Sequence, residues 1–155
     1  MKTLAIFDLD GTLLNTIDDL GTATNFALAK LNYPVHPIES YPYMVGNGVR
    51  KLIERALPHE MSGDDRTVAE MMKIFKEYYD THSTIHSHPY PGITDLLNSL
   101  NERGVNLAVA SNKYDLAVKN LISHFFPEIQ WAAVCGQKEG VPVKPDPSIV
   151  FDILN

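Results

Sequence analysis

Short apolar runs that alternate with helical stretches constrain the fold of this chain most strongly. Residues 3–7, 105–110 and 132–135 are too short for helices and end at polar or glycine-containing loops, a pattern typical of strands buried on both faces. Helical spacing of apolar residues precedes the central run over residues 94–103 and follows it over residues 114–126. Strand–helix–strand order of this kind predicts an α/β fold with a Rossmann-like, three-layer parallel sheet.

A long segment without strand alternation follows the first predicted strand. Helices are predicted over residues 16–31, 48–57 and 66–81. Asp18 and Asp19, near the start of the first of these, suit the positive end of the helix dipole. The sequence Tyr90-Pro91-Gly92 predicts a turn at which the chain returns to the sheet. We therefore expect a core made of residues 1–14 and 85–155, interrupted by a helical insertion over residues 15–84.

The composition is that of an ordinary globular protein and argues against several partners. Of 155 residues, 45% are apolar and 21% charged, and the net charge of -6 leaves no basic surplus for binding nucleic acid. Cys135 is the sole cysteine, so no internal disulfide can form and a reducing cytoplasm is expected. The first apolar run is broken at Asp8, and no segment has the length of a signal peptide core or a membrane span. We expect a cytoplasmic protein that binds neither nucleic acid nor membrane.

Two carboxylates follow the first predicted strand, in the sequence Asp8-Leu9-Asp10-Gly11-Thr12. If the strand continued, Asp8 and Asp10 would point to the same side, and such crowding is costly unless a cation lies between them. Mg²⁺, a hard cation with oxygen ligands, would meet this need. Gly11 permits a sharp turn whose exposed N–H groups can hold a phosphate. The alternative is a strand end with ordinary acidic turn residues.

Two later segments place polar groups where the other strands end, the edge at which parallel sheets bind ligands. Ser111, in the sequence Ala110-Ser111-Asn112-Lys113, could donate its hydroxyl to a phosphate oxygen. Lys144 precedes Pro145-Asp146-Pro147, and these prolines restrict the backbone and would aim the lysine. Taken alone, Ser111 is explained as an ordinary loop residue and Lys144 as an ordinary solvent-facing lysine. Together with Asp8, they make a more specific pattern than any one of them.

These segments closely resemble the haloacid dehalogenase superfamily of phosphohydrolases, and most nearly its phosphoglycolate phosphatase-like branch. The resemblance rests on Phe7-Asp8-Leu9-Asp10-Gly11-Thr12-Leu13, on Ser111-Asn112 and on Lys144-Pro145-Asp146-Pro147. Val45-Gly46-Asn47-Gly48 with Leu52 and Arg55-Ala56-Leu57 resembles the branch's cap signature, and Pro89-Tyr90-Pro91-Gly92 its return linker. The resemblance implies a haloacid dehalogenase-like core whose helical cap, residues 15–84, is inserted after the first strand.

The resemblance also implies a role for each site residue. Asp8 would attack phosphorus and form an aspartyl-phosphate, and Asp10 would protonate the leaving oxygen and then deprotonate water. Mg²⁺ would be held by the Asp8 carboxylate and the Asp10 main-chain carbonyl. The phosphate oxygens would be bound by Gly11, Thr12, Ser111 and Asn112, and their charge offset by Lys144.

Two features, one in the insertion and one beside its end, invite a functional interpretation. The sequence Gly46-Asn47-Gly48 before a helix could place N–H groups near a substrate anion, and Arg50 follows closely. Gly48 and Arg50 are therefore our candidates for substrate contact from the cap, with an ordinary helix start and a surface arginine as the alternative. His82, His86 and His88 have spacings that suggest a metal site, but no carboxylate or cysteine pattern accompanies them.

The fourth motif of the family, Gly-Asp-x-x-x-Asp after a fourth strand, does not follow the third motif here. The one Gly-Asp, Gly63-Asp64-Asp65, lies in the helical insertion. We therefore expect a chain that ends before the fourth strand, exposes an edge of the first strand beside Asp8, binds Mg²⁺ weakly and turns over poorly. Equal phosphatase activity in this chain and in one extended through the fourth motif would refute that expectation.

The function expected from these features is Mg²⁺-dependent hydrolysis of a small phosphorylated metabolite, a phosphate monoester such as 2-phosphoglycolate, by a monomer or homodimer. One alternative is a sugar-phosphate phosphomutase of the same fold, which would pass the phosphoryl group from Asp8 to a second sugar phosphate. Another is a catalytically impaired fragment or binding module. Phosphate release, isomer formation and loss of activity on Asp8→Asn discriminate among these.

Overall fold

The computed structural model describes residues 3–155, and the chain divides into two compact units. The first, which we call the sheet unit, comprises Met1–Asn15 and His88–Asn155. The second, the helical unit, comprises Thr16–Ser87. Each unit has its own buried core and is described by itself.

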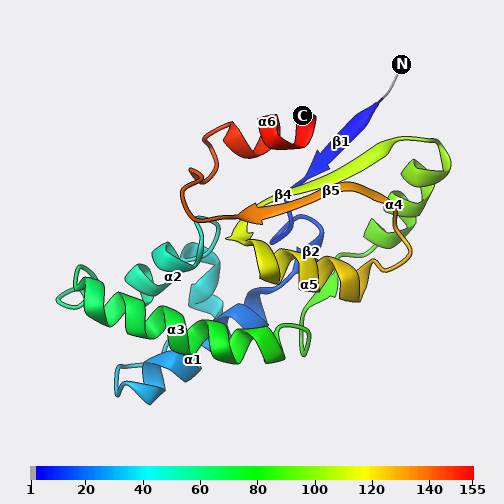
Figure 1. Ribbon diagram of the computed structural model, residues 1–155. Coiled ribbons are helices and arrows are strands. Elements are labelled where there is room, and N and C mark those ends of the chain that lie inside the picture. Colours follow the sequence, from blue (N-terminus) through cyan, green and yellow to red (C-terminus); the bar gives the residue numbers. More distant parts are fainter. Residues whose placement is uncertain (1–2) are drawn as a thin grey trace. The chain divides into compact units, whose positions relative to one another are not determined.

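Three parallel strands form the sheet unit's main sheet, in the order β1-β4-β5 (Figure 1). They are β1 (Leu4–Phe7), β4 (Asn106–Tyr114) and β5 (Trp131–Gln137). Phe7 of β1 pairs with Val109 of β4, so Asp8 and Ala110 follow at the same level of the sheet. The predicted parallel α/β sheet is confirmed. Among the described strands, β1 borders β4 alone and forms one edge of the sheet.

Helices cover both faces of this sheet. They are α4 (Ile93–Glu102), α5 (Asp115–Phe125) and α6 (Ser148–Leu154), and Figure 1 shows α5 and α6 on opposite sides of the strands. Side chains alternate along β4, so Leu107 and Val109 share a face and pack in one buried cluster with Leu97 of α4 and Val118 of α5. The smaller Ala108 and Ala110 alternate with them.

The turn after β1 folds back into this core. Leu9, Leu13 and Leu14 are fully buried, which fixes the turn from its apolar side. Leu14–Asn15 forms strand β2, which pairs antiparallel with β3 (His88–Pro89). Strands of two residues leave no periodic signal, and the sequence analysis did not predict them.

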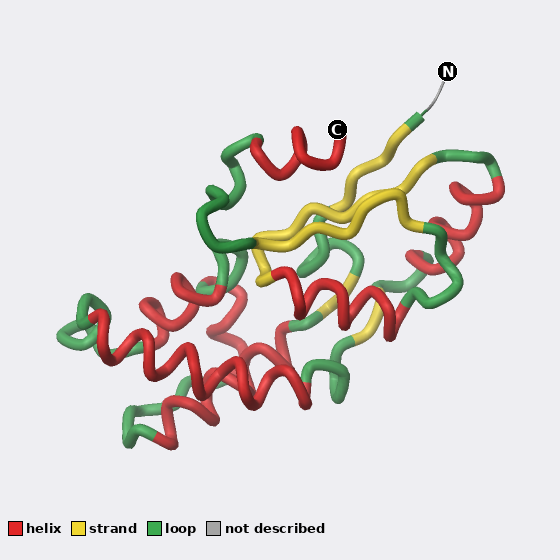
Figure 2. Tube along the Cα trace, viewed as in Figure 1, coloured by secondary structure: helices red, strands yellow, loops and turns green. Residues whose placement is uncertain are grey.

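The helical unit is built from α1 (Ile17–Lys30), the 3₁₀ helix η1 (Ile38–Tyr43), α2 (Val49–Ala56) and α3 (Asp65–His82), and Figure 2 shows them as helices joined by loops. The core that α1 and α3 share includes Leu28, Val68, Met71 and Tyr79, all fully buried. The three helices predicted here are present, with each end moved by one residue. No helix of residues 3–155 is long and apolar enough to cross a membrane.

A buried carboxylate fixes the last residues of the helical unit. The side chain of Asp19, 3% exposed in the first turn of α1, accepts the N–H groups of His86 at 3.0 Å and of Ser87 at 2.7 Å. The Ser87 hydroxyl donates to it as well, at 2.6 Å. Asp19 therefore anchors the segment by which the chain leaves this unit, beyond any effect on the helix dipole.

Candidate functional site

Asp8 and Lys144 form an ion pair at the carboxyl end of β1. Lys144 Nζ lies 3.1 Å from Asp8 Oδ1 and 2.7 Å from the main-chain carbonyl of Ala110. Asp8 Oδ1 also accepts the N–H of Leu9 at 2.8 Å. The Asp8 side chain is 46% exposed, and no hydrogen bond from residues 3–155 reaches its Oδ2. One carboxylate oxygen is thus held in place while the other is open to a reactant.

Asp10 has a lysine partner of its own. Lys113 Nζ, on β4, lies 3.1 Å from Asp10 Oδ1, and the two side chains are 5% and 19% exposed. A single cation between the two carboxylates was the expectation from sequence. In the structure each carboxylate has a separate ammonium partner, and the expected shared cation stays a prediction. No role was predicted for Lys113 from the sequence.

The end of β4 departs from regular strand geometry where these residues lie. We expected a strand that ends at Ala110, but β4 continues to Tyr114. Ala110 pairs with Cys135 and Tyr114 with Gln137, so β4 uses more residues than β5 over the same stretch. Irregularities of this kind redirect side chains near active sites. Ser111, 1% exposed, accepts the N–H of Lys113 at 3.1 Å and lies inside this irregular segment.

Asn112 binds the backbone of Lys144 with both ends of its side-chain amide. Its Oδ1 accepts the Lys144 N–H at 2.7 Å, and its Nδ2 donates to the Lys144 carbonyl at 3.3 Å. The role predicted for this side chain, to orient phosphate oxygens, stays a prediction. The amide is already engaged by the loop that carries Lys144, so it holds that loop to the end of β4.

The turn after Asp10 also differs from expectation. Gly11 has a φ of +79°, a conformation that favours glycine, and lets the chain reverse. The N–H groups of Thr12, Leu13 and Leu14 all donate to the Leu9 carbonyl, and that of Gly11 donates to the Leu14 carbonyl. The Leu9 and Leu14 carbonyls accept these four N–H groups within the turn, so these four groups are not the exposed donors we expected. Thr12 is exposed and offers its hydroxyl.

A hydrogen bond between α5 and β5 braces the irregular strand end. Asp115 Oδ1 accepts the N–H of Gly136 at 2.9 Å, and its Oδ2 accepts Lys119 Nζ at 2.6 Å. Partial burial raises the pKa of Asp115, but the hydrogen bonds from Lys119 and Gly136 outweigh it, so the pKa lies below its ordinary value. A Cβ on Gly136 would lie 2.6 Å from the carbonyl oxygen of Lys113. Glycine is therefore needed for β5 to approach β4 at this level.

In the helical unit, Gly48 precedes α2 with a φ of +89°, and Arg50 lies in its first turn. The Arg50 guanidinium donates to Glu54 at 2.9 Å and to Asp65 at 2.7 Å. Its charge is therefore shared between two carboxylates on the surface of this unit. Of the histidines, His82 stacks on Tyr78 with ring centroids 3.8 Å apart.

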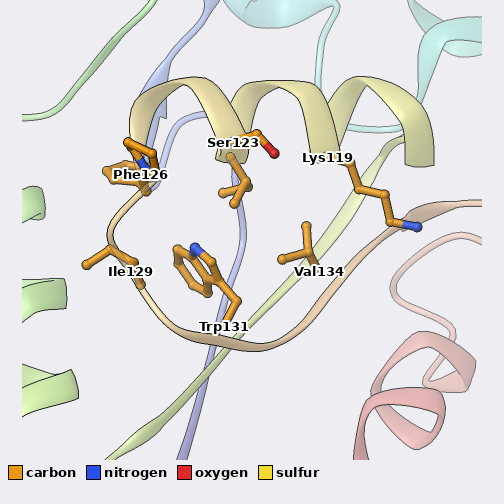
Figure 3. Close-up of a pocket in the computed structure, with 8 residues that line it drawn as sticks. Lys119, Ser123, Phe126, Ile129, Trp131 and Val134 are labelled. Atoms are coloured by element: carbon orange, nitrogen blue, oxygen red, sulfur yellow. The ribbon is translucent and has the colours of Figure 1, made fainter.

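An apolar pocket of about 380 Å³ lies between α5 and β5 (Figure 3). Its lining includes Phe126, Trp131 and Val134, with Lys119 at one side. Trp131 begins β5, whereas Asp8 follows the last residue of the parallel strand β1. The pocket therefore lies toward the amino ends of the strands, opposite to the edge where parallel sheets bind ligands. We do not assign it to the candidate site.

The donors near Asp8 fit a magnesium ion only in part. Among residues 3–155, no cluster of three or more His, Cys, Asp or Glu side chains is arranged to hold a metal. Mg²⁺, however, keeps several waters and binds through one or two carboxylates together with substrate phosphate. The open Oδ2 of Asp8 and the main-chain carbonyl of Asp10 are hard oxygen donors of the required kind. Both donors follow a single strand end.

Comparison with known proteins shows the family to which this chain belongs. The sequence profile described as "Haloacid dehalogenase-like hydrolase" matches residues 5–155. The chain belongs to this family. As a haloacid dehalogenase-like chain, it carries the motifs expected at β1, at the end of β4 and before α6.

The curated relatives are phosphoglycolate phosphatases by name. Phosphoglycolate phosphatase 1 of Pseudomonas aeruginosa is 32% identical over 158 residues, which cover 99% of this chain and 57% of the relative. The phosphoglycolate phosphatase of Haemophilus influenzae is 33% identical over 150 residues, which cover 94% of this chain and 67% of the relative. This haloacid dehalogenase-like chain thus spans between half and two thirds of the length of these relatives.

Solved structures share the fold of this family member. A predicted phosphoglycolate phosphatase from Haemophilus somnus has a TM-score of 0.88 at 26% identity, covering 99% of this chain and 70% of that one. CbbY from Rhodobacter sphaeroides, solved in complex with phosphate, has a TM-score of 0.79 at 23% identity, covering 99% of this chain and 72% of that one. The CbbY comparison bears on the fold alone.

Proposed function

We propose that this chain carries the nucleophile and the proton-transfer residue of a Mg²⁺-dependent phosphate monoester hydrolase, with 2-phosphoglycolate as substrate. The observation that supports this most directly is the pair of lysine-bound carboxylates at one sheet edge, Lys144 with Asp8 and Lys113 with Asp10, each at 3.1 Å. Separate ammonium groups give the two carboxylates different surroundings, as different chemical tasks require.

In the first step, an oxygen of the Asp8 carboxylate attacks phosphorus. A bond forms between Asp8 and phosphorus as the ester P–O bond breaks, and the leaving oxygen takes a proton from Asp10. Lys144, fixed by Asp8 Oδ1 and the Ala110 carbonyl, offsets negative charge beside the reacting group. Ser111 and Thr12 supply hydroxyl groups at the same strand ends.

In the second step, Asp10 takes a proton from water as the water oxygen attacks the phosphorus of the aspartyl-phosphate. The bond between phosphorus and the Asp8 oxygen breaks, which releases inorganic phosphate and restores the Asp8 carboxylate and the protonated Asp10. Asp8 and the Asp10 carbonyl would hold Mg²⁺, which would supply charge neutralisation around phosphorus. The helical unit would act as the cap, with Gly48 and Arg50 contacting the substrate.

The test is phosphate release from 2-phosphoglycolate with and without Mg²⁺, for the wild-type chain, for Asp8→Asn and for Asp18→Asn as a control. Asp18 is an exposed carboxylate of the helical unit. We expect metal-dependent release that Asp8→Asn abolishes and Asp18→Asn leaves intact. Isomer formation from a sugar phosphate without net phosphate release would instead indicate a phosphomutase, and no turnover of any phosphate ester would indicate a binding module.

A further inference from the structure

We propose that Lys113 is a positioning residue, which fixes the orientation of the Asp10 carboxylate for the step in which Asp10 takes a proton from water. This rests on the proposed function for its role in turnover. The Lys113–Asp10 ion pair is largely buried, with 5% of the lysine and 19% of the aspartate side chain accessible. The exposed pair Lys51–Glu54 has the same 3.1 Å separation but a lysine that is 58% exposed.

Burial makes the difference between these pairs. An exposed ion pair contributes little because water competes for both charges. A lysine ammonium as buried as that of Lys113 is costly without a counter-charge, so it binds its carboxylate partner strongly and directionally. The Asp10 side chain is therefore restrained by an interaction that solvent replaces poorly.

The backbone of Lys113 is restrained as well. Its N–H donates to the buried Ser111 hydroxyl at 3.1 Å, within the irregular end of β4. Its carbonyl lies against Gly136, which the Asp115 carboxylate holds at 2.9 Å. The lysine thus extends from a fixed point on β4 to Asp10 on the turn after β1. This link between two strand ends is what a positioning residue requires.

The link engages one oxygen of Asp10 and has a chemical consequence. With Oδ1 bound to Lys113, the carboxylate is held in a single orientation, and its second oxygen is presented in one direction. Misplacement of a catalytic group by about 1 Å can slow a reaction about 100-fold. Without Lys113, the Asp10 side chain would lose this buried restraint, and the fraction of time it faces the reacting water would fall.

The first experiment measures this orientation without any turnover. Vicinal couplings between the Asp10 carboxyl carbon and its own backbone nitrogen and carbonyl report χ1. We expect a single rotamer in the wild-type chain and in Lys51→Met, and rotamer averaging in Lys113→Met. Lys113→Gln, which keeps a polar end, is the second variant should Lys113→Met fail to fold, and averaging is expected there too. A single unchanged rotamer in the folded variants overturns the proposal.

The second experiment separates the two chemical steps with 4-nitrophenyl phosphate. Its phenolate leaves without needing a proton, whereas hydrolysis of the aspartyl-phosphate still needs Asp10. In Lys113→Met we expect a burst of nitrophenol, accumulation of phosphorylated chain and a steady-state rate about 10-fold or more below wild type.

Three outcomes contradict the positioning role in turnover. A burst and a steady state that fall together indicate that Lys113 only supports the fold, a rise in KM alone indicates a substrate contact, and unchanged kinetics indicate no role. If the wild-type chain releases no phosphate from any ester, the proposed function fails, while the χ1 couplings still decide whether Lys113 orients Asp10.

Discussion

Replacement of Gly136 by alanine tests the close approach of β5 to the end of β4. A Cβ built on Gly136 lies 2.6 Å from the Lys113 carbonyl oxygen, 2.6 Å from the Asp115 Cα and 2.8 Å from the Asp115 nitrogen. All three are backbone atoms, so no side chain can rotate away to relieve the contact. The strand end must move instead, by enough to restore ordinary van der Waals separation.

The cost of that movement has two parts. Overpacking in a well-packed region destabilises a protein by about 1–3 kcal/mol. Displacement of Gly136 also weakens its 2.9 Å hydrogen bond to Asp115, and a hydrogen bond to a charged group contributes about 1.5–3 kcal/mol. Because the bond is lost only in part, we expect Gly136→Ala to lower the free energy of unfolding by about 2–4 kcal/mol, which corresponds to a decrease in Tm of roughly 5–15 °C.

Urea unfolding followed by circular dichroism measures this change. Gly63→Ala is the matched control, because a Cβ there meets nothing within 4 Å and the residue has no positive φ. We expect Gly63→Ala to be neutral or slightly stabilising, because alanine reduces the freedom of the unfolded chain. Equal stability of the two variants would show that the end of β4 yields without cost and that the Gly136 contact is not restrictive.

Three further substitutions test the other contacts. Asn112→Leu removes both hydrogen bonds to the Lys144 backbone, so the free energy of unfolding should fall by about 1–2 kcal/mol and the Lys144 amide should exchange hydrogen faster. Unchanged exchange would show that Asn112 does not hold the Lys144 loop. Asp19→Asn places an amide group against the Ser87 donors, so the free energy of unfolding measured by thermal unfolding should fall by about 2–3 kcal/mol. A loss smaller than about 0.5 kcal/mol would argue that Asp19 does not anchor this segment. Asp115 has a lowered pKa in the folded chain, so its stabilising effect is present above the ordinary value near 3.9 and is lost as pH falls through the lower folded value. Below about pH 4 the Tm of the wild-type chain should therefore approach that of Asp115→Asn, and a constant difference in Tm down to about pH 2 would refute this.

Local sequence patterns predicted the elements well because their signals are local. The apolar run before Asp8 and the helical periodicities are properties of neighbouring residues, and the corresponding elements are present. The two-residue pair β2 and β3 was missed because it depends on residues far apart in the chain. Continuation of β4 past Ala110 was missed because Ser111 and Asn112 resemble loop residues, while pairing of Tyr114 with Gln137 keeps them in the strand.

The partners of polar side chains were less predictable, because a partner is chosen in three dimensions. Asp19 looked like a residue that favours a helix start, yet its carboxylate is buried against Ser87. Asn112 was predicted to bind phosphate, and the contact of its amide with the backbone of Lys144 was not predicted. Lys113 follows two motif residues and carried no signal of its own. Its near-complete burial, which singles it out, cannot be read from a lysine in a sequence.

Asn112 and Lys113 are consecutive and make different contacts, which restricts the number of residues between Ala110 and Tyr114. Asn112 reaches the loop of the lysine that binds Asp8, and Lys113 binds Asp10 directly. A one-residue shift along a strand delivers a different side chain to every position. Pairing of Tyr114 with Gln137 fixes the strand immediately beyond. Insertion or deletion between Ala110 and Tyr114 would therefore misdirect both contacts at once, so sequences that keep this arrangement can vary in residue type here far more readily than in length.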